Sequence, residues 1–192
     1  MHQPLDRRQF LAATGVGFIA AGCNRRGDNS PDGPAVARTA GPAIVKATDG
    51  RSQMKLPEGW TVVKDLNDHA DLQVGDERRD VFAVVLTEPK EDFAADFTYR
   101  DFARKRLETF QAALEDVGNK KGPTDLTVGG RPAVQSEFSA LATKDRIRLY
   151  YIHTSVDGKS AYHQLMTWSL FSARAASRDT LEEAIRGFTD LS

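Results

Sequence analysis

Residues 146–170 read RIRLYYIHTSVDGKSAYHQLMTWSL, and this stretch decides the predicted fold class. Aromatic and β-branched residues are frequent in 146–156 and occur in 159–170 as Tyr162, Thr167 and Trp168. The Asp157-Gly158 pair between the two segments is typical of a tight turn, so the stretch predicts an antiparallel hairpin. A two-residue turn there places one group of side chains on a common face: Ile147, Leu149, Tyr151, His153, Tyr162, Gln164, Met166 and Trp168. A slip of one residue would divide these aromatic side chains between two faces, so we prefer the first register.

The sequence on either side of this hairpin predicts further strands at 61–63, 71–74, 80–87, 124–128 and 132–141. The 80–87 segment, DVFAVVLT, is a continuous β-favouring run, which is typical of a central strand covered on both faces. Gly129-Gly130 separates the last two segments and predicts a second hairpin. We therefore expect a mostly antiparallel sheet of about six strands.

Two segments have the apolar spacing of amphipathic helices. The first is predicted over residues 99–117, starting at a capping-box-like pair, Thr98 and Asp101, and ending at Gly118-Asn119. The second is predicted to start at a capping box formed by Thr180 and Glu183, and to bury one stripe of side chains: Leu181, Ala184, Ile185, Phe188 and Leu191. Helices layered on a mostly antiparallel sheet predict an α+β fold, an α/β/α sandwich.

The first 23 residues have the organisation of an export signal. Arg7 and Arg8 form a positively charged segment, and the short apolar stretch 10–22 follows it. Thirteen helical residues span about 20 Å, which is less than the roughly 30 Å hydrocarbon core of a bilayer, so this stretch is too short to cross a membrane as a helix. The run Ala20-Ala21-Gly22-Cys23 resembles the lipobox of bacterial lipoproteins. This resemblance implies cleavage between Gly22 and Cys23 and lipidation of the Cys23 thiol.

The residues before the apolar stretch also resemble the twin-arginine export motif. Arg7, Arg8, Phe10 and Leu11 match its pattern, whereas Asp6 replaces the usual Ser or Thr. The resemblance implies export by the twin-arginine route, and general secretion stays open because ordinary signals also carry paired arginines. The alternative to an export signal is a buried helix at 10–19 with the cysteine packed in the core.

These features divide the chain into three parts. Residues 1–22 are expected to be a signal peptide, residues 23–53 a lipidated cysteine with a flexible linker rich in Gly, Pro and Ser, and residues 54–192 a single α+β domain. We expect an exported protein, held on the membrane by its lipid and facing the periplasm or the cell surface. Asn24 after the cysteine resembles lipoproteins that move on to the outer membrane, if the host has two membranes.

Composition excludes several kinds of function. The 192 residues carry a formal net charge of −1, which gives no electrostatic reason to expect nucleic-acid binding. A single cysteine excludes an intrachain disulfide and a zinc site built from cysteines. The sequence contains neither a G-x-S-x-G motif nor a phosphate-binding glycine loop before a helix, so no catalytic residue, metal site or cofactor is predicted.

Four residues are candidates for ligand contact: His153, His163, Asp68 and His69. In the preferred register the hairpin histidines project to opposite faces, which excludes a bridging metal ion. Asp65, Asn67 and His69 have the spacing of the first ligands of a calcium loop, but Ala70 stands where the sharp turn needs glycine. We therefore prefer to interpret 65–71 as a connector built on Asx turns.

The order of elements resembles the PsbP/DcrB-like group over residues 55–191. The resemblance rests on Leu-Pro-x-Gly-Trp at 56–60, on Val-Gly-Gly-Arg-Pro-Ala at 128–133, and on Tyr162-His163-Gln164-Leu165 followed by Trp168. It implies an antiparallel sheet layered with helices, as in extrinsic photosystem subunits and envelope lipoproteins, and it implies no shared catalytic residues. We expect a non-catalytic envelope binding or accessory module with a protein or small-ligand partner. The alternative is an envelope hydrolase or metal-dependent enzyme whose site is assembled from distant residues.

Overall fold

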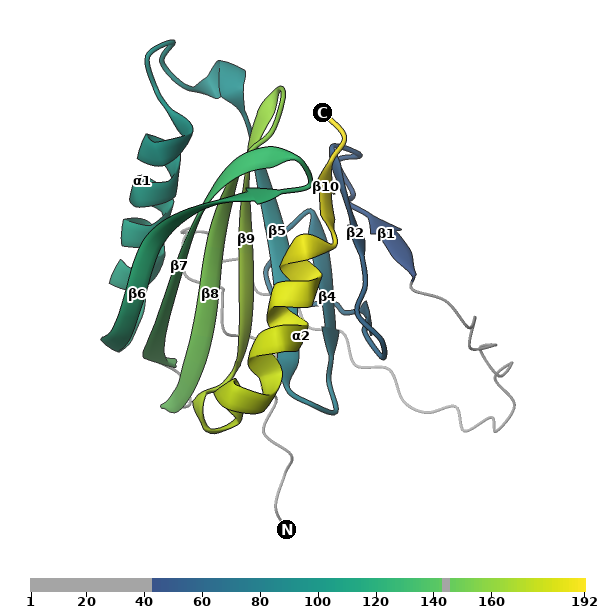
Figure 1. The fold of residues 1–192 in the computed structure, drawn as a ribbon, viewed down its shortest axis with the longest axis vertical. Helices are drawn as coiled ribbons and strands as arrows, with labels where there is room; N and C mark the ends of the chain where they lie inside the picture. Colours follow the sequence, from purple (N-terminus) through teal and green to yellow (C-terminus); the bar gives the residue numbers. More distant parts are fainter. Residues whose placement is uncertain (1–42, 143–145) are drawn as a thin grey trace, which may run out of the picture.

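The computed structural model of the chain describes residues 43–142 and 146–192 (Figure 1). The strands are β1 (Ile44–Lys46), β2 (Ser52–Lys55), β3 (Thr61–Val62), β4 (Leu72–Asp76), β5 (Val81–Pro89), β6 (Glu115–Val128), β7 (Arg131–Ala142), β8 (Ile147–Asp157), β9 (Ala161–Leu170) and β10 (Phe188–Asp190). The helices are α1 (Tyr99–Ala112) and α2 (Arg174–Arg186), with short 3-10 turns η1 (Lys90–Asp92) and η2 (Phe171–Ala173). Within the described ranges, no helix combines the length and the apolar character that crossing a membrane requires.

The strands form two antiparallel sheets. The larger has seven strands in the order β3-β4-β5-β9-β8-β7-β6, and the smaller has three in the order β1-β2-β10. Helix α1 packs on one face of the larger sheet, here called the α1 face, while α2 and the smaller sheet pack on the other, the α2 face (Figure 1). The predicted α+β class is therefore confirmed, and the main sheet has seven strands where about six were expected.

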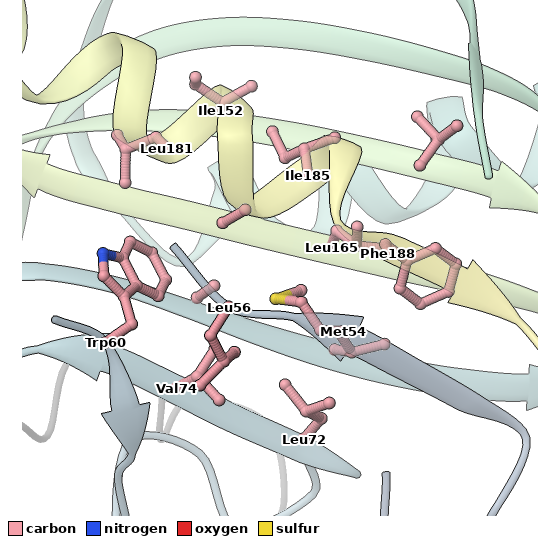
Figure 2. Close-up of a cluster of buried hydrophobic side chains, with 14 of the residues drawn as sticks. Met54, Leu56, Trp60, Leu72, Val74, Ile152, Leu165, Leu181, Ile185 and Phe188 are labelled. Atoms are coloured by element: carbon pink, nitrogen blue, oxygen red, sulfur yellow. The ribbon is translucent and has the colours of Figure 1, made fainter. Parts of the chain in front are cut away.

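Two hydrophobic clusters hold these layers together. On the α2 face, side chains from α2 such as Leu181 and Ile185 meet Met54 of β2 and Leu165 of β9 (Figure 2). On the α1 face, Phe110 of α1 packs with a second cluster that includes residues of β7, β8 and β9. Because β5 lies between these clusters, every residue from Val81 to Val85 is buried, as the continuous β-favouring run predicted.

The hairpin of β8 and β9 has the predicted faces but a longer loop. Tyr151 lies opposite Trp168 and His153 lies opposite Met166, so the aromatic side chains share the α1 face as expected. The last pair is Asp157 with Tyr162, however, which leaves four residues, 158–161, in the loop instead of the predicted two. The loop is held by contacts outside the hairpin, including a hydrogen bond from the Lys159 amide to Asp190, and these contacts decide its length.

The first predicted helix is too long. It begins with the expected capping box of Thr98 and Asp101 but ends at Ala112, and residues from Glu115 onward form β6. Leu114, between α1 and β6, and Val117 of β6 were both assigned to the helical stripe, and both still pack against the α1-face cluster. Pairing with the long strand β7 satisfies the backbone of this segment and overrides its helical pattern.

The second predicted helix is placed too far along the chain. Helix α2 begins at Arg174, so Thr180 lies inside it and forms no cap. The helix ends before Gly187, where a Cβ would lie 2.2 Å from the Lys55 carbonyl oxygen. This close approach directs the next residues into β10, so Phe188 is buried from a strand, whereas Leu191 is 44% exposed and not buried as predicted.

The predicted linker also extends too far. Strand β1 lies inside the 23–53 segment, and β2 begins within it at Ser52, which is fully buried. Strand β2 pairs with β10 at the other end of the chain, with Phe188 opposite Met54. A pairing between such distant residues leaves no local pattern in the sequence. The signal-peptide residues, the export motif and Cys23 lie outside the described residues.

Candidate functional site

The two histidines of the β8–β9 hairpin lie on opposite faces of the sheet, as predicted. His153 points to the α1 face and is 2% exposed, while His163 points to the α2 face and is fully buried. A metal ion between them is therefore excluded by the geometry. Each histidine has its own set of partners, and we consider the two sites separately.

His153 lies beneath α1. The Phe110 ring stacks on it with a centroid distance of 6.4 Å, and the side-chain amide nitrogen of Gln164 lies 3.0 Å from its Nε2 atom. An amide NH₂ can only donate, so Nε2 accepts and the ring proton lies on Nδ1. Burial lowers the pKa of His153 to about 4, so the ring is neutral at pH 7.

His163 lies in a buried hydrogen-bonded chain. Its Nε2 atom lies 3.0 Å from Oδ1 of Asp190, and its Nδ1 atom lies 3.1 Å from the hydroxyl oxygen of Thr87. The Thr87 amide in turn donates to Asp71 over 2.8 Å. Burial lowers the pKa of His163, although the hydrogen bond and charge of Asp190 oppose this shift.

Asp190 connects several segments that are distant in sequence. Its Oδ2 atom accepts hydrogen bonds from Arg131, next to the β6–β7 turn, and from the Lys159 amide in the β8–β9 loop. Its Oδ1 atom accepts from His163 and from the amide and hydroxyl of Ser192. Burial alone would raise the pKa of this carboxyl, but the hydrogen bonds from Ser192, Lys159 and His163 outweigh it and hold the pKa well below its ordinary value.

This geometry suits a structural role better than a catalytic one. A general base needs a free ring nitrogen within reach of a substrate, but both nitrogens of His163 are occupied and the ring is inaccessible. Ser192 donates its hydroxyl to Asp190 over 2.6 Å, and no bond joins it to the histidine. The three side chains therefore do not form the serine–histidine–aspartate relay of a hydrolase.

The Asp68 and His69 candidates lie in an exposed connector between β3 and β4. The His69 amide donates to Oδ1 of Asn67 over 2.8 Å, which is an Asx turn, as preferred from the sequence. Gln73 supports the same loop by accepting from the amides of Leu66 and Asn67. The structure therefore does not bring Asp68 or His69 together with either hairpin histidine, and in 43–142 and 146–192 no three His, Cys, Asp or Glu side chains converge as a metal site requires.

A second charged group on the α2 face was not predicted. Glu137 of β7 accepts the Tyr150 hydroxyl over 2.7 Å and an Arg178 nitrogen over 2.8 Å, which ties α2 to β7 and β8. Burial raises the pKa of Tyr150, and the hydrogen bond and charge of Glu137 raise it further. The only sequence signal was a glutamate at an inward position of β7, and such a signal does not identify its partners.

Comparison with known proteins identifies the fold. No family model and no curated protein matches the sequence. The solution structure of PsbP (CyanoP) from the cyanobacterium Synechocystis matches with a TM-score of 0.56, covering 83% of this chain and 98% of that chain at 13% identity. The chain has a PsbP-like fold.

A second solved structure matches over a similar share of the chain. The crystal structure of LpqN, which is involved in cell envelope biogenesis of Mycobacterium tuberculosis, has a TM-score of 0.52 and 13% identity, and the match covers 81% of this chain and 88% of that chain. At this identity the PsbP-like matches establish the fold alone, so no residue role is transferred from either protein.

Proposed function

We propose that this chain is an exported lipoprotein whose PsbP-like domain acts in the cell envelope by binding a protein or small-ligand partner, without catalysing a reaction. The observation that carries the proposal is the run Ala20-Ala21-Gly22-Cys23 after a short apolar stretch and the Arg7-Arg8 pair. Removal of residues 1–22 would make the single cysteine of the chain the lipid attachment point. Several acyl chains on one cysteine would hold the domain stably on a membrane.

The described domain supports a binding role. His153 is hydrogen-bonded to Gln164, and His163 is hydrogen-bonded to Thr87 and Asp190. Neither histidine is therefore available as a general base in this arrangement. The PsbP-like fold and its occurrence in LpqN, a protein of envelope biogenesis, are compatible with an accessory role in the envelope. A hydrolase would require a nucleophile and a base that converge on an accessible surface.

The experiment that tests the proposal compares the wild type with Cys23→Ser in bacteria that export lipoproteins. Wild type should take up labelled palmitate and fractionate with membranes, and Cys23→Ser should lose the label. Arg7→Lys with Arg8→Lys is the matched control for the route, because it keeps the charge but removes the paired arginines that the twin-arginine pathway requires. A Cys23→Ser protein that remains labelled and membrane-bound would refute lipidation at this residue.

The binding role needs its own experiment. Crosslinking of the anchored protein in cells, followed by affinity purification, should recover the same envelope partner with wild type and lose it when the domain 43–192 is deleted. Recovery of no domain-dependent partner, together with hydrolysis of an envelope substrate by the purified protein, would favour the enzyme alternative.

A further inference from the structure

Three buried hydroxyl groups on the β8–β9 hairpin have no hydrogen-bond partner among the described residues. One belongs to Tyr151, whose ring packs against Phe110 and Phe138. The other two belong to Ser155 of β8, which is 1% exposed, and Thr167 of β9, which is fully buried. Leaving a buried hydroxyl unpaired is costly, and native proteins usually satisfy such groups with ordered water or a ligand. The surroundings of the Ser155 and Thr167 hydroxyls differ, so we compare these two groups.

Ser155 lies within a group of polar side chains on the α1 face. Gln164 is directly opposite it on β9, and the amide of Gln164 contacts His153, the next residue along β8 on this face. Ser136 of β7 is directly opposite His153. These four polar side chains are adjacent on three neighbouring strands, and each is at most 7% exposed. Together they offer several hydroxyl and amide groups to a guest molecule.

Thr167 has apolar side chains directly opposite it, Ile152 of β8 on one side and Ala83 of β5 on the other. The next polar side chain on this face, Ser169, already donates its hydroxyl to the Leu170 carbonyl. A buried water needs two to four polar partners, and the side chains opposite Thr167 supply none. We therefore expect the Thr167 hydroxyl to stay dry.

Helix α1 shields these four polar side chains from solvent. The Phe110 ring stacks over His153, and the Phe102 ring stacks over Tyr162 with a centroid distance of 4.9 Å. At the edge of this cover, Arg106 of α1 is paired with Glu88 of β5. A guest held beneath these rings would exchange slowly with bulk water.

We propose that Ser136, His153, Ser155 and Gln164 form an internal site that binds a hydroxyl oxygen beneath α1. The oxygen belongs either to an ordered water molecule or to a small hydroxylated ligand retained from the cell, since both present the same donor and acceptor chemistry. The oxygen bonds to the Ser155 hydroxyl and completes the hydrogen bonding of this group. The site does not depend on the proposed lipid anchor or on an envelope partner.

The test combines a high-resolution crystal structure of the purified protein with two matched variants. We expect electron density within about 3.2 Å of the Ser155 Oγ atom. An isolated peak identifies water, and extended density with a matching small molecule in the mass spectrum identifies a ligand, so both results support the site.

The variants Ser155→Ala and Thr167→Val each remove one of the two hydroxyls and are compared by urea unfolding. Ser155→Ala removes a partner of the bound oxygen and should raise the unfolding equilibrium constant roughly five-fold. Thr167→Val removes an unpaired hydroxyl and should leave this constant unchanged or lower it. The proposal is overturned if no density lies near Ser155, or if Ser155→Ala stabilises the protein as Thr167→Val does.

Discussion

The Nε2 atom of His163 lies 3.0 Å from Oδ1 of Asp190, and this bond joins strand β9 of the large sheet to strand β10 of the small one. The side chains of both residues are at most 1% exposed. Because Arg131 and the Lys159 amide bond to the same carboxylate, Asp190 holds two hairpin ends and the C-terminal strand together. The fold therefore depends on a carboxylate that no local sequence pattern identified.

Substituting Asp190 with Asn should destabilise the protein by about 3 kcal/mol. Asn keeps the shape of the side chain but removes the charge, and it cannot accept all the hydrogen bonds that now converge on the carboxylate. Urea unfolding measures the change. Asp125→Asn is the control, because that carboxylate pairs with Arg100 at an exposed position and should contribute less than about 1 kcal/mol. Equal effects of the two substitutions would contradict the role assigned to Asp190.

Protonation of His153 should destabilise the fold in acid. The folded pKa of about 4 lies below the ordinary value of 6.5, so the folded state binds this proton less readily than the unfolded state. Stability should therefore fall as the pH drops from about 6.5 towards 4, by on the order of 3 kcal/mol. Unfolding measurements across this range, compared with His153→Gln, isolate the effect. An unchanged pH dependence in the variant would show that His153 is not responsible.

Gly158 should not tolerate a methyl group. A Cβ there would lie 2.6 Å from the Ala161 carbonyl oxygen and 2.7 Å from Nε2 of His163, so Gly158→Ala would push on the hydrogen bond between His163 and Asp190. We expect a loss of about 1–3 kcal/mol in thermal or urea unfolding. Gly118→Ala is the matched control, since nothing lies within 4 Å of its Cβ position. A neutral Gly158→Ala would mean that the loop is packed less tightly than the structure indicates.

The sequence predicted the faces of the strands more reliably than their ends. Alternation with a period of two fixes which side chains share a face, so Tyr151 and Trp168 were placed together correctly despite the wrong loop length. The ends depend on tertiary contacts. Val117 fits the apolar stripe of the predicted helix, and only the pairing of β6 with β7 places it in a strand.

For the candidate site too, features set by local sequence were predicted and features set by long-range contacts were not. Alternation correctly separated His153 from His163, and the Asx turn at Asn67 follows from local chemistry. Asp190 could not be identified, because β10 reaches His163 only after pairing with β2 near the start of the described chain. Contacts that depend on such long-range pairing have no counterpart in a local motif.

The most direct test of the proposed function is the intact mass of the wild-type protein purified from membranes. The proposal predicts a chain that begins at Cys23 and carries a diacylglyceryl group and an acyl chain on that residue. An unmodified chain that still begins with Met1 would contradict it.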